Sequence, residues 1–383
     1  MKVTKPGLLA VTLVSALTFS ALAMSDSKEK KNRKKKRLEK MEASDHYRDG
    51  KFFNDAPMDT FGFKKVMRIL KKHFTGKFPD KIANVEFPLS NTPWDNDLDS
   101  DLWFSWLGHS TVFLQIEGHK VLIDPVLSKR TSFVQWMGPK RMHPFPVNPD
   151  SIPDPDVIVI SHNHYDHLDK KSIKRLHPRT VHFLVPLGVG KYLESWGVDP
   201  GKIHEMDWWE EFQLNGLRIT LTPGQHGSGR GFGDKEETFW GGYAMKGKRK
   251  NVYYSGDTGF FKGFADIGNR LGPFDLSLIQ IGAYNKDWPK VHMFPEEAVD
   301  AQKMVKAKVM VPLHWGTFPL AFHSWYDPAV RIRKAMAKEN MPLVFPLLGE
   351  QVAYDKMDFE HVWWENLVPE KYKGTDIEQK TIK

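Results

Sequence analysis

The chain of 383 residues contains no cysteine, and this absence excludes several classes of chemistry. Disulfides, thiolate metal ligands, cysteine nucleophiles and a lipidated cysteine are all ruled out. Any metal in this protein has to be bound by His, Asp or Glu side chains. An exported protein without disulfides needs a large hydrophobic core, and a chain of this length with 40% hydrophobic residues can form one.

A basic excess is missing from most of the chain. Residues 1–40 contain eleven Lys or Arg and three Asp or Glu, so this segment alone accounts for the net charge of +8. Residues 41–383 are formally neutral. A nucleic-acid-binding domain carries its basic excess on the folded part. We therefore expect no nucleic-acid partner.

Long apolar runs are also absent after the first residues. At the N-terminus, Lys2 and Lys5 precede a nearly uncharged apolar run at 8–21, and Ala21-Leu22-Ala23 resembles a cleavage site. This pattern predicts a signal peptide at 1–23 and export to the periplasm or cell envelope. The alternative is an uncleaved membrane anchor, although the run is short for a bilayer span.

Two segments precede the main domain. Residues 24–45 are densely charged, and we expect them to be disordered or a frayed helix. Residues 46–99 are expected to form an N-terminal extension with a basic amphipathic helix at 60–75. Such a helix packs on its own domain or lies on a lipid surface, so peripheral membrane contact is a hypothesis. The apolar positions of this helix are Phe63, Val66, Met67, Leu70 and Phe74.

Residues 100–355 have the pattern of a domain that mixes strands and helices, and 356–383 are expected to be a C-terminal tail. Short apolar runs bounded by turn residues predict strands. The predicted strands are 102–106, 111–115, 120–123, 157–160, 180–185, 217–221, 239–245, 251–254, 276–281, 309–312 and 343–347. Helical spacing begins at 171, and further helices are predicted at 189–196, 295–307 and 327–339. Hairpins beside crossovers indicate mixed α/β layers.

The segment after the predicted strand 157–160 carries the clearest chemical signal. Ser161 is followed by His162, His164, Asp166 and His167 at H-x-H-x-D-H spacing. In extended chain, residues two apart point the same way, so the first two histidines can reach one metal. After the chain turns, the aspartate and the third histidine can face a neighbouring metal. Imidazole and carboxylate groups suit zinc and related ions.

Three further candidate ligands follow other predicted strands. His226 ends the run Leu221–His226, Asp257 lies between glycines in Ser255–Gly259, and His314 follows a strand in Val311–Gly316. Each has an ordinary structural explanation when taken alone. Their order after the H-x-H-x-D-H segment favours one metal centre built from several strand ends.

These motifs resemble the metallo-β-lactamase superfamily, and in particular its branch of N-acyl-phosphatidylethanolamine-hydrolysing phospholipases D and bacterial relatives. Over about residues 100–350, the matching stretches are 106–112, 124–126, 137–141, 161–169, 207–211, 255–259, 272–275, 281–284, 295–298 and 314–318. The resemblance implies a four-layer αββα sandwich of the α/β (α+β) class, with the metals at its open edge.

The resemblance also implies two divalent ions, expected to be Zn²⁺, although Mn²⁺ or Fe²⁺ suits the same ligands. It assigns the seven ligands as follows: His162, His164 and His226 to one ion, Asp166, His167 and His314 to the other, and Asp257 to both. A hydroxide bridging the ions would attack the substrate. Asp166 and Asp257 are the expected catalytic residues, one orienting the hydroxide and the other bridging the metals.

The resemblance implies a phospholipase D-type phosphodiesterase acting on N-acyl-phosphatidylethanolamine or a related lipid. One departure leaves an alternative open. The branch has an aromatic residue after the fifth ligand, whereas here Gly227 begins a glycine-rich stretch at 227–233, so the substrate wall can be wider. A hydrolase of a soluble ester, lactone or phosphodiester is therefore the second hypothesis. A non-catalytic envelope protein stabilised by metal is the third.

Several residues are candidates for supporting roles. Tyr284, His292 and His323 are possible substrate contacts, although each also has an ordinary polar explanation. His109 is expected to support the metal site through its ligands. Phe133, Trp136 and Met137 form an apolar cluster that contacts an acyl chain or packs in the core.

Overall fold

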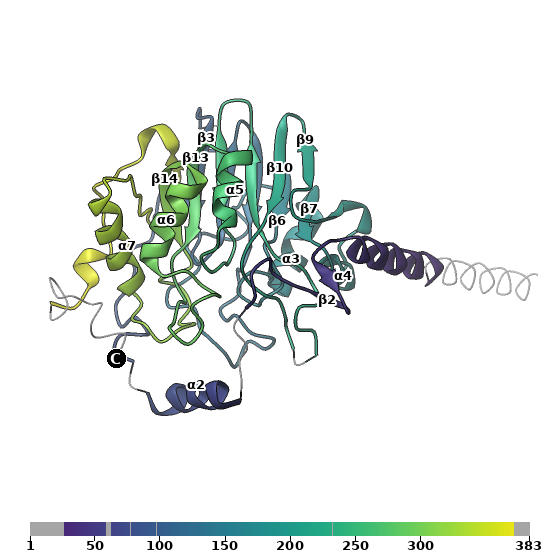
Figure 1. Ribbon diagram of the computed structural model, residues 1–383. Helices are drawn as coiled ribbons and strands as arrows, with labels where there is room; N and C mark the ends of the chain where they lie inside the picture. Colours follow the sequence, from purple (N-terminus) through teal and green to yellow (C-terminus); the bar gives the residue numbers. More distant parts are fainter. Residues whose placement is uncertain (1–26, 59–62, 77, 97, 232, 371–383) are drawn as a thin grey trace, which may run out of the picture. The chain divides into compact units, whose positions relative to one another are not determined.

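The computed structural model describes residues 27–58, 63–76, 78–96, 98–231 and 233–370 (Figure 1). The signal peptide expected at 1–23 lies outside these residues. Within the described part of the chain, no helix has both the length and the apolar character needed to cross a membrane. The chain divides into two compact units, one ending at Tyr47 and the other beginning at Arg48.

In the first unit, residues 27–42 are helical. This differs from disorder and agrees with the helical alternative for the charged segment. Opposite charges one turn apart stabilise the helix: Arg33 lies 3.7 Å from Glu29, and Lys35 lies 3.6 Å from Glu39. Lysine and glutamate are also strong helix formers, which explains why a densely charged segment becomes helical.

The second unit contains two large sheets. The first has the strand order β15-β3-β4-β5-β6-β7-β8, and the second has the order β14-β13-β12-β11-β10-β9. The strands of the first sheet are β3 (Leu102–Trp106), β4 (Val112–Ile116), β5 (His119–Ile123), β6 (Val157–Val159), β7 (His182–Pro186), β8 (Ile203–Met206) and β15 (Val352–Ala353). The strands of the second are β9 (Glu211–Leu214), β10 (Leu217–Thr222), β11 (Gly242–Lys246), β12 (Asn251–Tyr254), β13 (Phe274–Gln280) and β14 (Ala307–Leu313).

Helices cover the outer face of each sheet. The first sheet carries α3 (Lys170–Leu176) and α4 (Gly190–Ser195), and the second carries α5 (Gly263–Arg270), α6 (Pro295–Val305) and α7 (Asp327–Lys338) (Figure 1). The inner faces pack together, since the Tyr243 hydroxyl on β11 donates to the carbonyl oxygens of Ile160 and Leu184, at 2.9 and 3.1 Å. The predicted αββα sandwich is therefore confirmed.

Most predicted elements occur within a few residues of their expected positions. The turn between β4 and β5 has positive φ at Glu117 and Gly118, as a two-residue hairpin requires. The predicted strand at 343–347 is wrong, because this segment makes only an isolated bridge between Leu343 and Met310. Strands β8, β9 and β15 and helix α5 were not predicted, because short or polar segments carry a weak hydrophobic pattern.

The remaining elements lie outside the two large sheets and the helices that cover them. Strands β1 (Tyr47–Arg48) and β2 (Lys51–Phe52) precede α2 (Phe63–Thr75), the helix expected at 60–75. Short 3₁₀ helices occur at η1 (His177–Arg179), η2 (Pro200–Lys202), η3 (Tyr354–Lys356) and η4 (Glu365–Leu367).

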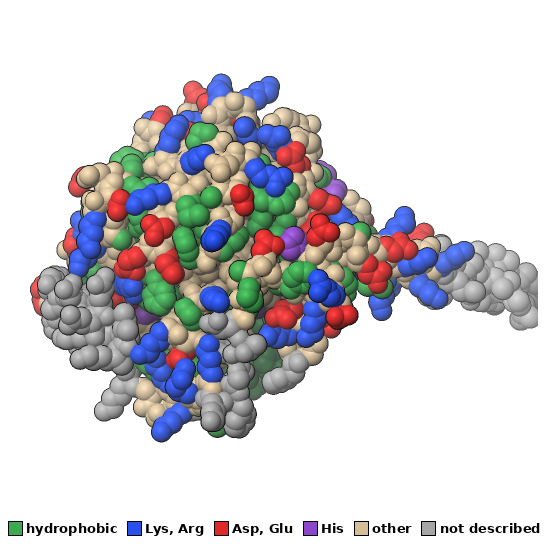
Figure 2. All heavy atoms as spheres, in the orientation of Figure 1, with side chains coloured by type: hydrophobic (Ala, Val, Ile, Leu, Met, Phe, Trp, Pro, Cys, Tyr) green, Lys and Arg blue, Asp and Glu red, His purple; other side chains and the backbone are tan. Residues whose placement is uncertain are grey.

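Both flanking segments of the second unit contact the sandwich. Arg68 of α2 donates to Asp287 at 2.6 Å, and Lys72 lies 3.8 Å from the same carboxylate. Figure 2 shows Lys and Arg side chains gathered in the region of α2. In the expected tail, Trp363 stacks on Trp315 with ring centroids 5.7 Å apart. Part of that tail therefore belongs to the hydrophobic core.

We expect Phe113→Ala to lower the free energy of unfolding by about 3–5 kcal/mol, because it leaves a cavity in the first sheet's core. Phe113 is fully buried and stacks on Trp103 at 5.3 Å. Chemical denaturation measures the effect, with Phe359→Ala, at a side chain 46% exposed, as the matched control. Equal losses in the two variants would contradict this account of the core.

Candidate metal centre

All seven predicted ligands meet at one edge of the sandwich. The H-x-H-x-D-H segment follows β6, His226 follows β10, Asp257 follows β12 and His314 follows β14. Parallel pairing of β12, β13 and β14 brings their carboxyl ends to one edge. Neighbouring backbones pack closely there. A Cβ added at Gly282, after β13, would lie 2.0 Å from the His314 carbonyl oxygen, so only glycine fits.

A first group of ligand atoms consists of three imidazole nitrogens. His164 Nδ1 lies 2.8 Å from His162 Nε2 and 3.3 Å from His226 Nε2. His162 Nδ1 faces Ser161 Oγ at 3.0 Å, and His226 Nδ1 faces the Val291 carbonyl oxygen at 3.0 Å. If both Nδ1 atoms carry the ring proton and donate it, each Nε2 atom is unprotonated and its lone pair points into the group. Converging lone pairs are the arrangement that a cation requires.

A second group lies beside the first. His314 Nε2 is 3.4 Å from Asp166 Oδ2, and His167 Nε2 is 3.7 Å from the same oxygen. Asp257 connects the groups, because its Oδ2 lies 3.1 Å from both of these nitrogens and 4.0 Å from His162 Nε2. Asp257 therefore lies between the two groups, and its bridging of two metals stays a prediction.

A bound cation fits the polar atoms left over at this site. Among the described residues, His167 Nε2, His314 Nε2 and Asp257 Oδ1 are buried without a hydrogen-bond partner. Orphaned buried polar atoms are costly and need an explanation. A bound cation would explain them. Within each group, the nitrogen and carboxylate oxygen atoms lie within 4.8 Å of one another, and they match the donor set of zinc and related ions.

Electrostatics keep the first group in the ligand form. Burial lowers the pKa of His162 and His164, and it lowers the pKa of His226 to about 4. The imidazoles are therefore neutral near pH 7, as metal binding requires. Burial alone would raise the pKa of Asp257, but His167 and other neighbouring histidines outweigh it and hold that pKa well below its usual range. Asp257 is consequently ionised.

Asp124 supports the site, a role that the sequence analysis did not assign. Its buried carboxylate accepts from the Ser161 backbone N–H at 2.7 Å, from the Ser161 hydroxyl at 2.5 Å and from the Tyr254 hydroxyl at 2.6 Å. His167 Nδ1–H donates to it at 2.6 Å, which fixes the ring so that Nε2 faces Asp257. Asp124 comes directly after β5 and begins the stretch 124–126 that matches the family branch, and this match was the available signal.

His109 lies behind the second group, in the supporting position expected for it. Its Nε2 is 3.0 Å from Asp166 Oδ2, and its backbone N–H donates to Thr317 Oγ1 at 2.7 Å. Burial, with the nearby His314, lowers the pKa of His109 to about 3. The neutral ring therefore donates to Asp166 and orients that carboxylate.

The three candidate substrate contacts have different positions. His292 reaches the metal groups, with Nδ1 3.9 Å from Asp257 Oδ2 and 3.0 Å from Gln280 Oε1. Tyr284 donates its hydroxyl to Asp327, and its contact with a substrate stays a prediction. His323 uses both ring nitrogens on backbone groups, at Ala283 N and Ser324 O, and its contact with a substrate stays a prediction as well.

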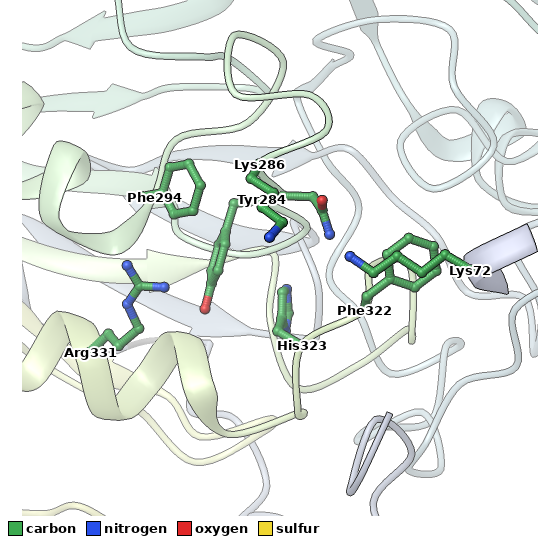
Figure 3. A pocket seen from close by; sticks show the side chains of 8 residues that line it. Lys72, Tyr284, Lys286, Phe294, Phe322, His323 and Arg331 are labelled. Carbon is green, nitrogen blue, oxygen red and sulfur yellow. The ribbon is translucent and has the colours of Figure 1, made fainter. Parts of the chain in front are cut away.

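One cavity opens beside the metal groups, and a second shares His323 with it. One is lined by His314, Lys81, Met142 and neighbouring residues. The other, shown in Figure 3, is lined by the aromatic rings of Tyr284, Phe294 and Phe322 together with the cationic groups of Lys72, Lys286 and Arg331. His323 lines both cavities, although both of its ring nitrogens are engaged by backbone groups. A ligand with an anionic group and an apolar part matches this lining.

The glycine-rich stretch after His226 is tied to the metal-binding segment by Arg230. Its Nη1 donates to the carbonyl oxygens of Asn163 and Leu168, each at 2.7 Å, and its guanidinium lies 3.9 Å from the Tyr165 ring centroid. The Tyr165 hydroxyl donates back to the Arg230 carbonyl oxygen at 3.1 Å. The side chain thus clamps the turn that presents the histidine and aspartate ligands.

Comparisons with known proteins agree with this architecture. Residues 119–315, which include all seven ligands, match the family model of the β-lactamase superfamily domain. A Caenorhabditis elegans protein named N-acyl-phosphatidylethanolamine-hydrolyzing phospholipase D 1 is 36% identical over 317 residues, covering 79% of this chain and 86% of that protein. An uncharacterized Mycobacterium tuberculosis protein is 41% identical over 328 residues, covering 84% of this chain and 88% of that protein.

A solved structure shows the same fold. A possible metal-dependent hydrolase from Veillonella parvula has a TM-score of 0.54 and 19% sequence identity, covering 66% of this chain and 99% of that chain. At this identity, the similarity concerns the fold alone.

We expect Asp124→Asn to weaken metal binding roughly 10–100-fold, because the amide no longer orients His167 as a charged acceptor does. Competition with a chromogenic chelator measures the affinity. Asp156→Asn, at a partly exposed carboxylate that accepts from the Lys120 backbone N–H, is the control. Wild-type affinity in Asp124→Asn would contradict the role given to this carboxylate.

Arg230→Ala is expected to raise the rate of metal loss about tenfold, since the two carbonyl oxygens on either side of the ligands lose a charged donor. Arg230→Lys should retain the metal better than Arg230→Ala but less well than the wild type, because a lysine lacks the planar guanidinium that stacks on Tyr165. Arg218→Ala, at an arginine 39% exposed in β10, is the matched control. Unchanged metal release in Arg230→Ala would show that the clamp has no such role.

Proposed function

We propose that this chain, which belongs to the metallo-β-lactamase superfamily, is a phospholipase D-type phosphodiesterase that hydrolyses N-acyl-phosphatidylethanolamine or a related lipid. The chain is a metal-dependent hydrolase by its family and by its candidate ligand cluster. Hydrolysis at the distal phosphoester bond would add one water and release phosphatidic acid and an N-acylethanolamine.

The observation that carries this proposal is the similarity to the C. elegans enzyme over 317 residues. It extends over most of both chains and is not confined to the segment that carries the candidate ligands. The cavity lining in Figure 3 supports the same substrate class, because Lys72, Lys286 and Arg331 lie among aromatic rings. A phospholipid offers a phosphate for the cations and acyl chains for the rings.

We propose two divalent ions, most simply Zn²⁺, with Mn²⁺ or Fe²⁺ compatible with the same ligands. His162, His164 and His226 would hold one ion, Asp166, His167 and His314 the other, and Asp257 would bind both. Bound there, such ions supply an activated water near neutral pH and withdraw charge from the phosphoryl group.

The chain's own residues would position the reactants. The Asp166 carboxylate, oriented by His109 Nε2 at 3.0 Å, can accept a hydrogen bond from the attacking water. His292, 13% exposed and held at Gln280 by Nδ1, faces the same space and can contact the phosphoryl oxygens through its other nitrogen. In the cavity lined by His314 and Met142, Lys81 lies in the same lining, and its positive charge favours an anionic substrate.

We further propose that the protein is exported to the cell envelope, where this substrate class occurs in membranes. The apolar run and cleavage site at 1–23 support this localisation.

The alternative of a soluble substrate rests on Gly227, at the position where the branch has an aromatic residue. With glycine there, the wall next to His226 lacks a side chain, so a smaller or differently shaped substrate would also fit.

Metal-loaded protein should convert N-acyl-phosphatidylethanolamine vesicles into phosphatidic acid and N-acylethanolamine, detected by mass spectrometry and abolished by a chelator. Asp257→Asn should lower the rate by at least about 100-fold and reduce the metal content, because a shared anionic ligand is lost. Asp275→Asn, at a carboxylate paired with Lys308 away from the site, is the control.

Two outcomes would count against the proposal. Full metal content with full activity in Asp257→Asn would remove the bridging role. No product from wild-type protein that carries its metals would reject the lipid substrate and favour a soluble ester, lactone or phosphodiester.

A further inference from the structure

We propose that the loop formed by residues 129–140 docks this protein on a bilayer surface with anionic headgroups. The inference rests on the proposed function only for the choice of a lipid bilayer as partner. The surface itself is defined by the exposure, charge and hydrogen bonds of the loop.

The loop presents large apolar side chains to solvent. Trp136 is 75% exposed, Phe133 is 68% exposed and Met137 is 46% exposed. Within the described part of the chain, Trp136 and Phe133 are the most exposed large hydrophobic side chains. The sequence analysis left acyl contact and core packing open for these three residues, and the structure excludes core packing. An exposed cluster of this kind typically marks an interaction surface.

The loop holds this conformation through its own hydrogen bonds. Thr131 N–H donates to the Pro139 carbonyl oxygen at 3.2 Å, and Arg141 N–H donates to the Lys129 carbonyl oxygen at 2.8 Å. Gln135 closes the interior, since its amide donates to the Arg130 carbonyl oxygen at 3.0 Å and accepts from the Arg130 N–H at 3.2 Å. Backbone polar groups bonded internally are cheap to bring into a lipid interface, where unpaired ones are costly.

The charges on the loop match an anionic lipid surface. Lys129, Arg130 and Lys140 lie at its base, and residues 129–140 contain no Asp or Glu. Both lysines are exposed. Tryptophan favours the headgroup level of a bilayer, and each nearby lysine or arginine adds attraction to anionic lipid. The aromatic side chains lie at the tip of the loop and the cations at its base. This order suits insertion of the tip into the bilayer while the cations stay at the headgroups.

The base of the loop is continuous with the wall of the metal site. The Arg141 guanidinium lies 4.7 Å from the Phe318 ring centroid, and Met142 N–H donates to the Thr317 carbonyl oxygen at 2.9 Å. Met142 and His314 line the same cavity. Docking through this loop would therefore bring the cavity beside a metal ligand close to the lipid headgroups.

The absence of cysteine from the chain allows a local test on the full-length protein. Trp136→Cys and Phe133→Cys each introduce a single thiol for an environment-sensitive fluorophore, and Phe359→Cys, at another exposed aromatic, is the matched control. Vesicles of phosphatidylcholine, with and without phosphatidylglycerol and lacking N-acyl-phosphatidylethanolamine, are the partner. A local label reports on the loop even if the basic N-terminal segment binds the same vesicles.

Labels at 133 and 136 are expected to brighten severalfold and shift to the blue on anionic vesicles, while the label at 359 does not respond. Lys129→Gln with Lys140→Gln should raise the lipid concentration for half-response roughly tenfold, because two cations near the surface are removed. Unchanged emission at 133 and 136 on vesicles that co-sediment with the protein would overturn the proposal. The proposal would also be overturned if, in the absence of lipid, the emission of these labels changed with protein concentration, because that result would identify a protein–protein interface.

Because these vesicles contain no proposed substrate, the result is independent of turnover. A responding loop without hydrolysis in the product assay would reject the proposed function and keep the docking surface. Hydrolysis with a silent loop would reject only the docking surface.

Discussion

The buried carboxylate of Asp124 is the group on which the metal centre depends. It has no exposed surface and receives hydrogen bonds from the Ser161 N–H and hydroxyl, from His167 Nδ1 and from the Tyr254 hydroxyl. A charge buried this deeply is tolerated only when it is fully hydrogen-bonded. Because its donors come from the segment after β6 and from β12, one carboxylate joins the two sheets and orients a ligand.

The open edge of the sandwich imposes a second constraint, because many backbones converge there. Asp124, His109, Ala283 and His314 all have positive φ, between 38° and 66°. This conformation is uncommon for residues with a side chain, and such positions cluster at functional sites. The surrounding sheets have to stabilise these turns, so the sandwich is the support that makes the converging ligands possible.

The surroundings of the metal groups combine charge and apolar surface in layers. Histidines and carboxylates form the centre, the cavities add Lys72, Lys81 and Arg331 among aromatic rings, and the exposed 129–140 loop ends next to the wall of one cavity. Under the proposals above, the cations close to the site would attract a phosphate, and the rings and the loop would suit acyl chains and a bilayer. The proposed lipid substrate would suit the metal groups and the cavities, and the bilayer that contains it would suit the loop.

The sequence alone indicated the seven candidate ligands and, through the family resemblance, the layered fold. The H-x-H-x-D-H spacing, and His226, Asp257 and His314 after apolar runs, are local patterns, and local periodicity also placed most of the strands. Only the tertiary structure decided which other residues reach the site. Asp124 acts through a loop separated from it by 37 residues, Tyr284 and His323 direct polar atoms to Asp327 and Ala283, which are 43 and 40 residues away, and the exposure of Trp136 depends on the packing around its loop. Spacing along a chain predicts which side chains share a strand end, whereas hydrogen-bond partners and exposure depend on elements far away in sequence.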